Sequence, residues 1–239
     1  MTFNLIGLGL NLGSLSLEAL NEIKKADKIY IENYTVELPY NAEELEKLIG
    51  KRIILLTRTL VENEKFVEEA KEKEIALLVY GSPLIATTHI SLILKCKKEA
   101  IEHRIIHNAS IFDAISETGL QFYKFGKTAS MPKWETNYKP ESFIEIIKDN
   151  QKINAHSLLL IDIGLSFSQA LKQFEEALGN SKLKTKLKKL VVCSQLGTEK
   201  SKIYYDSVES LYEKEVYAPF CFIIPSKLHF LEEEVISYE

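Results

Sequence analysis

Short apolar runs alternate with segments of helical periodicity through the first 110 residues. Ile75–Tyr80 is a continuous apolar run, which is typical of a strand buried on both faces. Leu17, Leu20 and Ile23 recur at helical spacing behind Ser14 and Ser16, whose side chains are suited to capping a helix. The pattern predicts strands at Thr2–Leu8, Lys28–Glu32, Arg52–Leu56, Ile75–Tyr80 and Arg104–His107, and helices at Leu15–Ala26, Glu43–Ile49, Lys65–Lys73 and His89–Ala100. This alternation predicts an α/β fold with a parallel sheet covered on both faces.

The rhythm changes after residue 110. Residues 119–125 and 131–140, the latter containing Pro, Asn and Trp, interrupt the pattern, and the chain shows no internal repeat. Helices are predicted at Ser110–Glu117, Glu141–Asn150 and Ser168–Leu178, and strands at Ser157–Ile163, Leu190–Gln195 and Phe220–Ile224. We therefore expect two α/β domains: residues 1–110 with a parallel sheet, and residues 111–239 with a mixed sheet.

Composition narrows the class of protein. Lys plus Arg number 30 against 34 for Asp plus Glu, a net charge of −4, which argues against a broadly basic nucleic-acid binder. No apolar run reaches the roughly 18 residues that a membrane span needs, and the opening segment lacks the features of a signal peptide. The three cysteines show no metal-binding spacing and cannot all pair, so we expect reduced thiols in a cytoplasmic protein with no metal and no membrane or nucleic-acid partner.

One concentrated basic run, Lys182–Lys189, permits two interpretations. It is either a solvated surface segment whose leucines contact the body, or a docking patch for an acidic or nucleic-acid-bearing partner.

A glycine motif lies between the first strand and the first helix. Gly7, Gly9 and Gly13 allow a sharp turn and leave room for a ligand to approach the backbone, a spacing that also resembles a dinucleotide-binding turn. Gly13, however, precedes the cap at Ser14 and Ser16, so the helix begins too late to direct its N-terminus at a pyrophosphate. A tight turn with no ligand is the alternative.

Two further loops follow strands of the predicted parallel sheet. Residues 81–89 offer hydrogen-bonding side chains at Ser82, Thr87, Thr88 and His89, although Thr87 or Thr88 would equally serve as a helix cap. Residues 107–111 form the other loop. Because ligands of open parallel sheets bind beyond the carboxyl ends of the strands, the three loops together predict a binding site for a medium-sized ligand.

Several segments carry a resemblance to a known family. They are GLGL at 7–10, ENYT at 32–35, PLIATTH at 83–89, IHNASI at 106–111, TGLQFYKFGK at 118–127, PESF at 140–143, HSLLLIDI at 156–163 and PSKLHFLE at 225–232. The chain resembles the diphthine synthases, which belong to the tetrapyrrole-methylase fold superfamily of S-adenosylmethionine-dependent methyltransferases. The motifs follow the family order along nearly the whole chain and outweigh the dinucleotide interpretation.

The resemblance implies two α/β domains with the cofactor, S-adenosylmethionine, in the cleft between them. It implies cofactor contacts at Leu10, Ser82, Ile85, Ser110, Ile111, Ile161, Leu196 and Phe220. Three of these positions depart from the family pattern. Ser82 replaces an acidic residue, so a charge-assisted contact to the cationic cofactor, worth roughly 1.5–3 kcal/mol, is lost. Leu196 stands in an atypical segment, and Phe220 occupies a position often held by His.

The resemblance also implies the reaction. The acceptor is the amine of a 3-amino-3-carboxypropyl group on a modified histidine of translation elongation factor 2, the product is diphthine, and the enzyme is a homodimer. Such methyl transfer needs no metal or catalytic triad, and the sequence singles out no catalytic base. The alternatives are another methyltransferase of the superfamily, acting on a tetrapyrrole or ribosomal RNA, and a non-catalytic binding module suggested by Ser82.

A few side chains invite more specific roles. His89 or His229 would serve as a proton acceptor, although a structural role is the simpler interpretation for each. Lys124 or Lys127 would attract the carboxylate of the acceptor. Nearby Tyr123 and Trp134 would meet a bulky acceptor or simply pack against the body of the domain.

Overall fold

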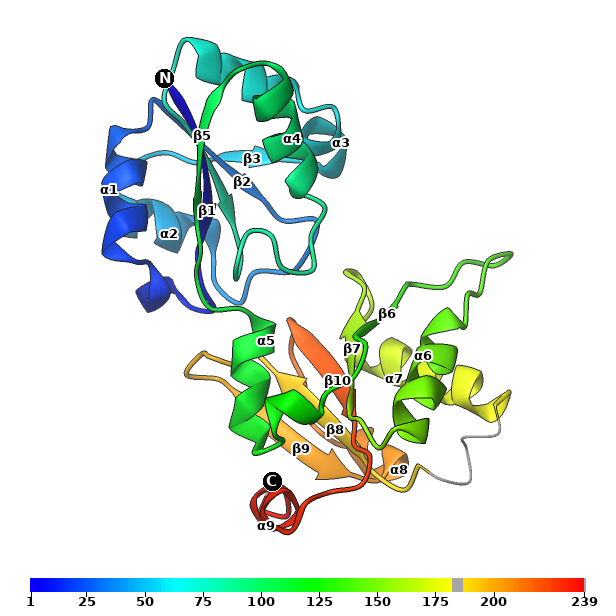
Figure 1. Cartoon of the computed structure of the whole chain (residues 1–239). Helices are drawn as coiled ribbons and strands as arrows, with labels where there is room; N and C mark the ends of the chain where they lie inside the picture. The colour runs from blue at the N-terminus through cyan, green and yellow to red at the C-terminus, as the bar shows by residue number, and fades with distance from the viewer. Residues whose placement is uncertain (182–186, 239) are drawn as a thin grey trace. The chain divides into compact units, whose positions relative to one another are not determined.

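The computed structural model describes residues 1–181 and 187–238, which form two compact units (Figure 1). One unit is Met1–Asp113 and the other begins at Ala114. Most of the basic run at Lys182–Lys189 lies outside the described residues, so both interpretations of it stay predictions.

The first unit is built on a five-stranded parallel sheet. Its strands are β1 (Thr2–Gly7), β2 (Lys28–Glu32), β3 (Ile54–Leu56), β4 (Ile75–Val79) and β5 (Glu102–Ile106), arranged in the order β3-β2-β4-β1-β5. All five residues of β4 are buried, as their uninterrupted apolar character predicted. The predicted parallel sheet is confirmed.

Helices cover both faces of this sheet, because side chains on a strand alternate between its two faces. Ile6 of β1 joins a core with α1 (Leu17–Lys25) and α2 (Ala42–Ile49). Phe3 and Leu5 join a second core on the other face. That face is covered by α3 (Arg58–Glu62), the 3-10 helix η2 (Lys65–Lys71) and α4 (Ile90–Lys98), on the opposite side from α1 and α2 (Figure 1).

Local signals set the beginning of the first helix. The Ser16 side chain accepts a hydrogen bond from the backbone N–H of Ala19 at 3.0 Å, so α1 begins at Leu17, later than the predicted Leu15. Leu12–Ser14 forms only a short 3-10 turn, η1. The inference that the helix begins well after Gly13 is confirmed. A helix was expected at Lys65–Lys73, but only Lys65–Lys71 is helical and it is a 3-10 helix, η2; α3 was not predicted.

The second unit contains a mixed five-stranded sheet, which confirms the predicted sheet type. Its strands are β6 (Ala129–Met131), β7 (Ser157–Ile161), β8 (Leu190–Ser194), β9 (Lys202–Asp206) and β10 (Phe220–Ile224), in the order β6-β7-β10-β8-β9. Only β6 and β7 are parallel neighbours, and the other pairs are antiparallel. The short strands β6 and β9 were not predicted.

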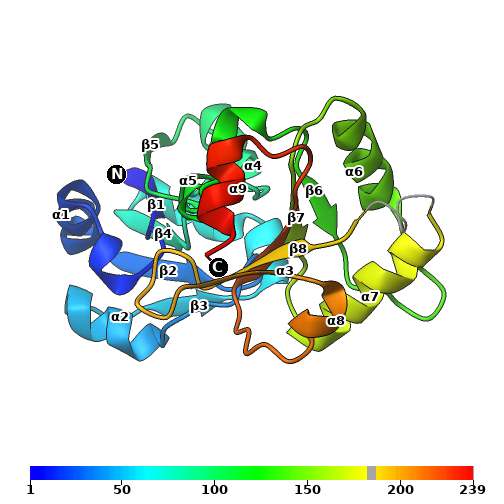
Figure 2. The same ribbon diagram turned by 90° about the horizontal axis from the view of Figure 1, so that it is seen from below.

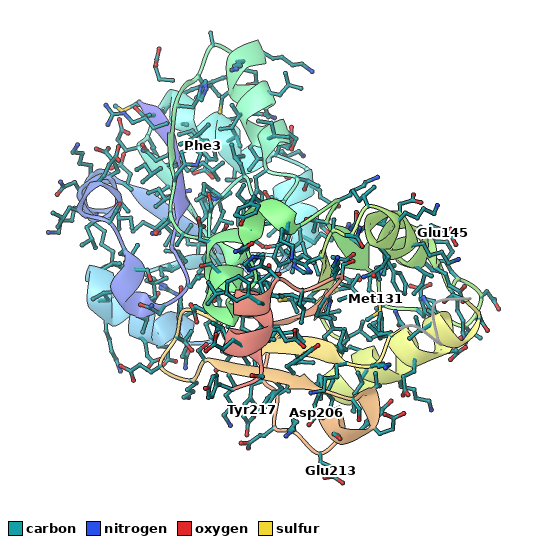
Figure 3. The ribbon with its side chains drawn as sticks, turned by 60° about the horizontal axis from the view of Figure 1, so that its bottom comes forward. Phe3, Met131, Glu145, Asp206, Glu213 and Tyr217 are labelled. Carbon is teal, nitrogen blue, oxygen red and sulfur yellow. The ribbon has the colours of Figure 1, made fainter. Side chains whose placement is uncertain are left out.

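One face of this second sheet carries the main core of the unit. Phe143 of α6 (Ser142–Lys152) and Phe174 of α7 (Phe167–Gly179) pack with Phe222 of β10, and Figure 2 shows both helices from a second direction. In Figure 3, Met131 lies inside this unit and Phe3 inside the first, each fully buried. The remaining helices are α5 (Ile111–Ala114), η3 (Ile115–Thr118), η4 (Phe122–Lys124), α8 (Val208–Leu211) and α9 (Phe230–Ile236).

Three kinds of feature bear on the class of protein: the cysteines, helices able to span a membrane, and groups of side chains able to hold a metal ion. Cys96, Cys193 and Cys221 are all buried, as expected of packing residues, and burial raises the pKa of the Cys96 thiol to about 11. Among residues 1–181 and 187–238, no helix has the length and apolar character needed to cross a bilayer. The same residues contain no group of three His, Cys, Asp or Glu side chains placed to hold a metal ion.

Candidate functional site

Three loops meet at the carboxyl ends of β1, β4 and β5 in the first unit. Gly9 and Gly81 exchange two backbone hydrogen bonds, of 3.1 and 3.0 Å, which join the loop after β1 to the loop after β4. Asn108, after β5, donates from its amide to the carbonyl oxygens of Gly7 at 3.2 Å and Ser14 at 2.8 Å. The predicted convergence of the three loops is therefore confirmed.

The glycines are required by contacts between these loops. A Cβ added at Gly7 would lie 2.7 Å from the Gly81 carbonyl oxygen, and one at Gly9 would lie 2.4 Å from the Ser14 Cβ. Gly9 also has a φ of +71°, which favours glycine. The expectation that Gly7 and Gly9 leave room for a ligand is wrong, because the chain's own loops fill that space. Gly81 differs, since nothing lies nearer than 3.8 Å to its added Cβ.

The predicted contacts on the first two loops lie at this edge. Leu10 is buried, and its carbonyl oxygen accepts a hydrogen bond from the Tyr80 hydroxyl at 3.0 Å. Ser82 is 6% exposed, whereas Ile85, three residues further along, is 42% exposed. Tyr80 was not predicted to matter; its place at the end of an apolar strand beside the loop is the signal that would have indicated it.

Ser110 and Ile111 follow on the third loop. The Ser110 backbone N–H and hydroxyl both donate to Asp113 Oδ2, at 2.7 and 3.0 Å, and its Oγ accepts from the Phe112 N–H at 3.2 Å. The Ser110 side chain thus caps the first turn of α5. Ile111 beside it is half-buried and apolar. A ligand at this edge would meet mainly apolar side chains, backbone groups and the Ser82 hydroxyl, which makes no hydrogen bond to another residue in the described ranges.

Thr88 of the second loop is exposed, whereas Thr87 and His89 make contacts within the chain. Thr87 Oγ1 donates to the Pro83 carbonyl oxygen at 2.9 Å, and His89 Nδ1 lies 3.2 Å from the same oxygen. His89 is 1% exposed and stands at the N-cap position of α4, although its side chain makes no capping hydrogen bond. The expectation that Thr87 and His89 offer groups to a ligand is therefore wrong, and a structural role is confirmed for His89.

Three further predicted residues lie together at one edge of the sheet in the second unit. Ile161 ends β7, Leu196 follows β8 and Phe220 begins β10, and the antiparallel pairing of β10 with both neighbours brings these ends to the same side. Leu196 is buried, whereas Ile161 and Phe220 are half-buried and pack against the core. The Gln195 backbone N–H donates to the Pro219 carbonyl at 2.8 Å, which holds the two adjoining loops together.

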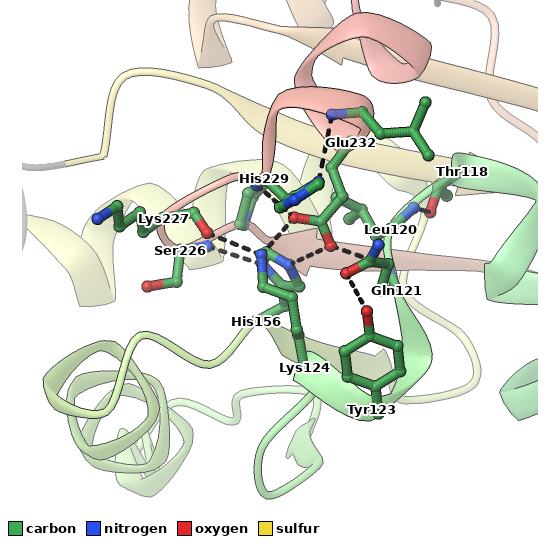
Figure 4. A network of polar contacts seen from close by, with 12 residues as sticks. Thr118, Leu120, Gln121, Tyr123, Lys124, His156, Ser226, Lys227, His229 and Glu232 are labelled. Carbon is green, nitrogen blue, oxygen red and sulfur yellow. Dashed lines mark hydrogen bonds and ion pairs between the residues drawn. The ribbon is translucent and has the colours of Figure 1, made fainter.

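A buried carboxylate, Glu232, organises a separate network in the second unit (Figure 4). Its Oε1 accepts hydrogen bonds from the Gln121 N–H at 2.9 Å and from His156 Nε2 at 3.2 Å. Its Oε2 accepts from the His229 N–H at 2.7 Å and from the Lys124 ammonium. The network thus joins α9 to residues 121–124 and to the beginning of β7.

The network fixes the protonation of both buried groups. Burial opposes ionisation of Glu232, but the His229 N–H, the Lys124 ammonium and the Gln121 N–H outweigh it and lower the pKa to about 2. His156 Nδ1 accepts from the Ser226 N–H at 2.9 Å, so Nε2 carries the hydrogen that is donated to Glu232. Burial lowers the pKa of His156 and keeps the ring neutral.

The hydrogen bonds of this network overturn two hypotheses drawn from the sequence, one on Lys124 and one on His229. Lys124 already pairs with Glu232 and donates to the Lys227 carbonyl at 2.9 Å, so it is not available as the cation for an acceptor carboxylate. His229 accepts from the Leu231 N–H at 3.4 Å and caps α9, which is a structural role. Lys127 has an exposed position and stays a prediction. Tyr123 is 80% exposed, and Trp134 packs against the core.

Comparison with known proteins identifies the family to which this chain belongs. The sequence model of the tetrapyrrole (corrin/porphyrin) methylases matches residues 2–212. The chain therefore belongs to this family, and it is a methyltransferase.

Individual relatives narrow the assignment. A diphthine synthase of Methanocaldococcus jannaschii is 39% identical over 98% of this chain and 97% of its own length. The diphthine methyl ester synthase of Schizosaccharomyces pombe is 44% identical over 67% of this chain and 58% of its own. A crystal structure of diphthine synthase, 31% identical, superposes with a TM-score of 0.89 over 100% of this chain and 95% of that one. Within the tetrapyrrole methylases, the chain thus belongs to the diphthine synthase family.

Proposed function

We propose that this protein transfers methyl groups from S-adenosylmethionine to the 3-amino-3-carboxypropyl group on a modified histidine of translation elongation factor 2, giving diphthine. The observation that carries the proposal is the 39% identity to a diphthine synthase over nearly the full length of both chains. A match of this extent includes both units, so it supports the whole activity and not a shared domain alone. It also argues against a tetrapyrrole or ribosomal RNA acceptor and against a non-catalytic module.

The residues at the carboxyl ends of β1, β4 and β5 fit S-adenosylmethionine. Leu10 and Ile85 offer apolar contacts, and the Ser82 hydroxyl has no hydrogen bond to another described residue. When bound, the cofactor supplies an electrophilic methyl group on a sulfonium. All eight predicted contacts, including those at Ile161, Leu196 and Phe220, stay part of this proposal.

The chain's own contribution is to bind, orient and exclude water. Apolar side chains such as Ile85 and Ile111 disfavour the charged form of an amine held beside them, because burial lowers the pKa of an ammonium group. A neutral amine has the lone pair needed for attack. Neither histidine that we considered as a base is exposed at this edge, since His89 is buried with its Nδ1 at the Pro83 carbonyl and the His229 side chain caps α9 in the second unit.

A second product is favoured by one observation. The Schizosaccharomyces pombe relative is a diphthine methyl ester synthase and is 44% identical over 164 residues. Methylation of the acceptor carboxylate, in addition to its amine, is therefore our second candidate.

An acceptor screen tests the proposal. The protein is incubated with methyl-labelled S-adenosylmethionine and, in separate reactions, with elongation factor 2 carrying the aminocarboxypropyl group, unmodified factor, a tetrapyrrole precursor and ribosomal RNA. Label should enter only the modified factor. Label in the tetrapyrrole or the RNA would show that this molecule, and not the modified factor, is the acceptor. The absence of label from every acceptor would favour a binding module.

The same proposal includes the setting in which the protein works. We place it in the cytoplasm as a homodimer, with elongation factor 2 as its protein substrate and without a membrane or a direct nucleic-acid partner. The three cysteines, none of which is in a disulfide, agree with a reducing compartment. Sedimentation of the purified chain tests the dimer.

A further inference from the structure

The loop that follows β4 is held by hydrogen bonds to one carbonyl group. The Pro83 carbonyl oxygen accepts from Thr87 Oγ1 at 2.9 Å and has His89 Nδ1 at 3.2 Å. Between them, Ala86 adopts a φ of +55°, a left-handed conformation that is unfavourable for a residue with a Cβ. The backbone therefore needs partners that keep it in this conformation.

The His89 ring has one defined donor. A carbonyl oxygen only accepts hydrogen bonds, so Nδ1 carries the hydrogen. Burial lowers the pKa of His89, which keeps the ring neutral and leaves a lone pair on Nε2. This Nε2 is buried, has no hydrogen-bond partner and lies 4.0 Å from Glu32 Oε1.

Glu32 organises the neighbouring loop. Its Oε2 accepts from the backbone N–H groups of Tyr34 at 3.0 Å and Thr35 at 3.1 Å, and its Oε1 accepts from the Thr35 hydroxyl. The Tyr34 ring packs edge-to-face on His89, with centroids 6.3 Å apart. The histidine ring thus fills the space beside the loop after β2, while its Nδ1–H holds the loop after β4.

We propose that His89 is a positioning residue for the methyl donor, acting through the Pro83 carbonyl on the loop that carries Ser82 and Ile85. The Ile85 N–H donates to the Ser82 carbonyl at 3.1 Å, so the two predicted contacts belong to the turn that Pro83 forms. Losing the Nδ1–H donor frees this turn. The proposal rests on the proposed function only in naming S-adenosylmethionine as the ligand.

Two substitutions separate the hydrogen bond from the packing of the ring. His89→Phe keeps a ring against Tyr34 and removes the donor. His89→Asn places an amide nitrogen near the position of Nδ1, so it keeps the donor but removes the ring. If His89 acted only by packing, His89→Asn would weaken binding more than His89→Phe, because losing the ring leaves a cavity.

Binding of S-adenosylmethionine is measured by calorimetry, alongside unfolding in urea. We expect His89→Phe to weaken binding about tenfold while losing less stability than His89→Asn, and His89→Asn to bind within about threefold of the original. Thr87→Val, which lacks the hydroxyl, should weaken binding of S-adenosylmethionine as His89→Phe does. Thr87→Ser, which keeps the hydroxyl, should bind as the original chain does. Unchanged binding by His89→Phe, or an equal loss in His89→Asn, would overturn the proposal.

Hydrogen exchange without ligand keeps this test separate from the proposed function. A peptide spanning residues 82–88 should exchange faster in His89→Phe than in the original or His89→Asn. If the original chain does not bind S-adenosylmethionine, the proposed function fails and the exchange rates alone decide whether His89 holds the loop. Equal exchange in all three proteins would refute that role.

Discussion

His156, the residue before β7, donates a hydrogen bond from Nε2 to Oε1 of Glu232, 76 residues later on α9, over 3.2 Å. Both side chains are fully buried, so the contact replaces water that each group would otherwise bind. Because Glu232 also accepts from the Lys124 ammonium and the Gln121 N–H, this one carboxylate joins α9 to residues 121–124 as well as to His156.

Replacing this carboxylate should destabilise the second unit. Glu232→Gln leaves the Lys124 ammonium without its anion, and we expect the free energy of unfolding to fall by about 3–5 kcal/mol. Urea denaturation checks this. Glu234→Gln, on the exposed side of the same helix, is the control and should change stability by less than about 0.5 kcal/mol. Equal effects of the two variants would contradict the role of the network.

Acid should weaken the same network. The Glu232 pKa is lowered from 4.5 to about 2, so its ionised form stabilises the fold above pH 4.5. This stabilisation, about 3 kcal/mol, is lost as the pH falls from about 4.5 towards 2. Neutral His156, whose pKa is lowered from 6.5, adds a loss of the same sign below about pH 6.5. Urea unfolding at a series of pH values should show both losses in the original chain, and the Glu232 component should be absent in Glu232→Gln.

Gly9 and Gly50 form a matched pair for testing the loop contacts. Both have a positive φ, of +71° and +69°, but an added Cβ meets Ser14 at 2.4 Å at Gly9 and nothing within 4 Å at Gly50. Gly50→Ala should therefore cost about 1 kcal/mol of stability, from backbone strain alone. Gly9→Ala should cost at least about 2 kcal/mol more and should weaken binding of S-adenosylmethionine. Thermal unfolding and calorimetry measure the two effects, and equal losses would show that loop packing does not require Gly9.

Ser82 allows a gain of affinity to be tested. An acidic side chain here should restore a charge-assisted contact to the sulfonium cofactor, and Ser82→Asp should bind S-adenosylmethionine roughly tenfold more tightly. Ser82→Asn has the same shape without the charge and should not show this gain. The difference in affinity between the Asp and Asn variants should decrease as salt is added. Equal affinities of the Asp and Asn variants would place Ser82 away from the cofactor's charge.

The sequence indicated the parts of the fold that depend on local pattern. The continuous apolar run at Ile75–Tyr80 predicted a buried parallel strand, observed as β4, and Ser16 indicated where the first helix begins. The spacing of Phe66 and Val67 did not distinguish an α-helix from the observed 3-10 helix, because both place these residues against the same core. The edge strand β9 was missed because its residues are only half-buried and its apolar signal is weak.

The candidate site was predicted less completely, for a physical reason. Convergence of the three loops follows from parallel topology, which the strand pattern indicates. Which side chains turn inward depends on partners far apart in sequence, such as Asn108 and Gly7, or Lys124 and Glu232. Residue type alone therefore suggested Lys124 as the cation for an acceptor carboxylate and His89 as a proton acceptor, whereas each already has a partner within the protein.

The proposed reaction is tested most directly by mass analysis of the modified histidine peptide. Elongation factor 2 carrying the aminocarboxypropyl group is incubated with this protein and S-adenosylmethionine, and the peptide is weighed before and after mild alkali. We predict added mass in steps of one methyl group on that residue; steps that survive alkali are N-methyl groups, and a step lost in alkali is a methyl ester. An unchanged peptide mass, with both proteins folded and the cofactor bound, would contradict the account.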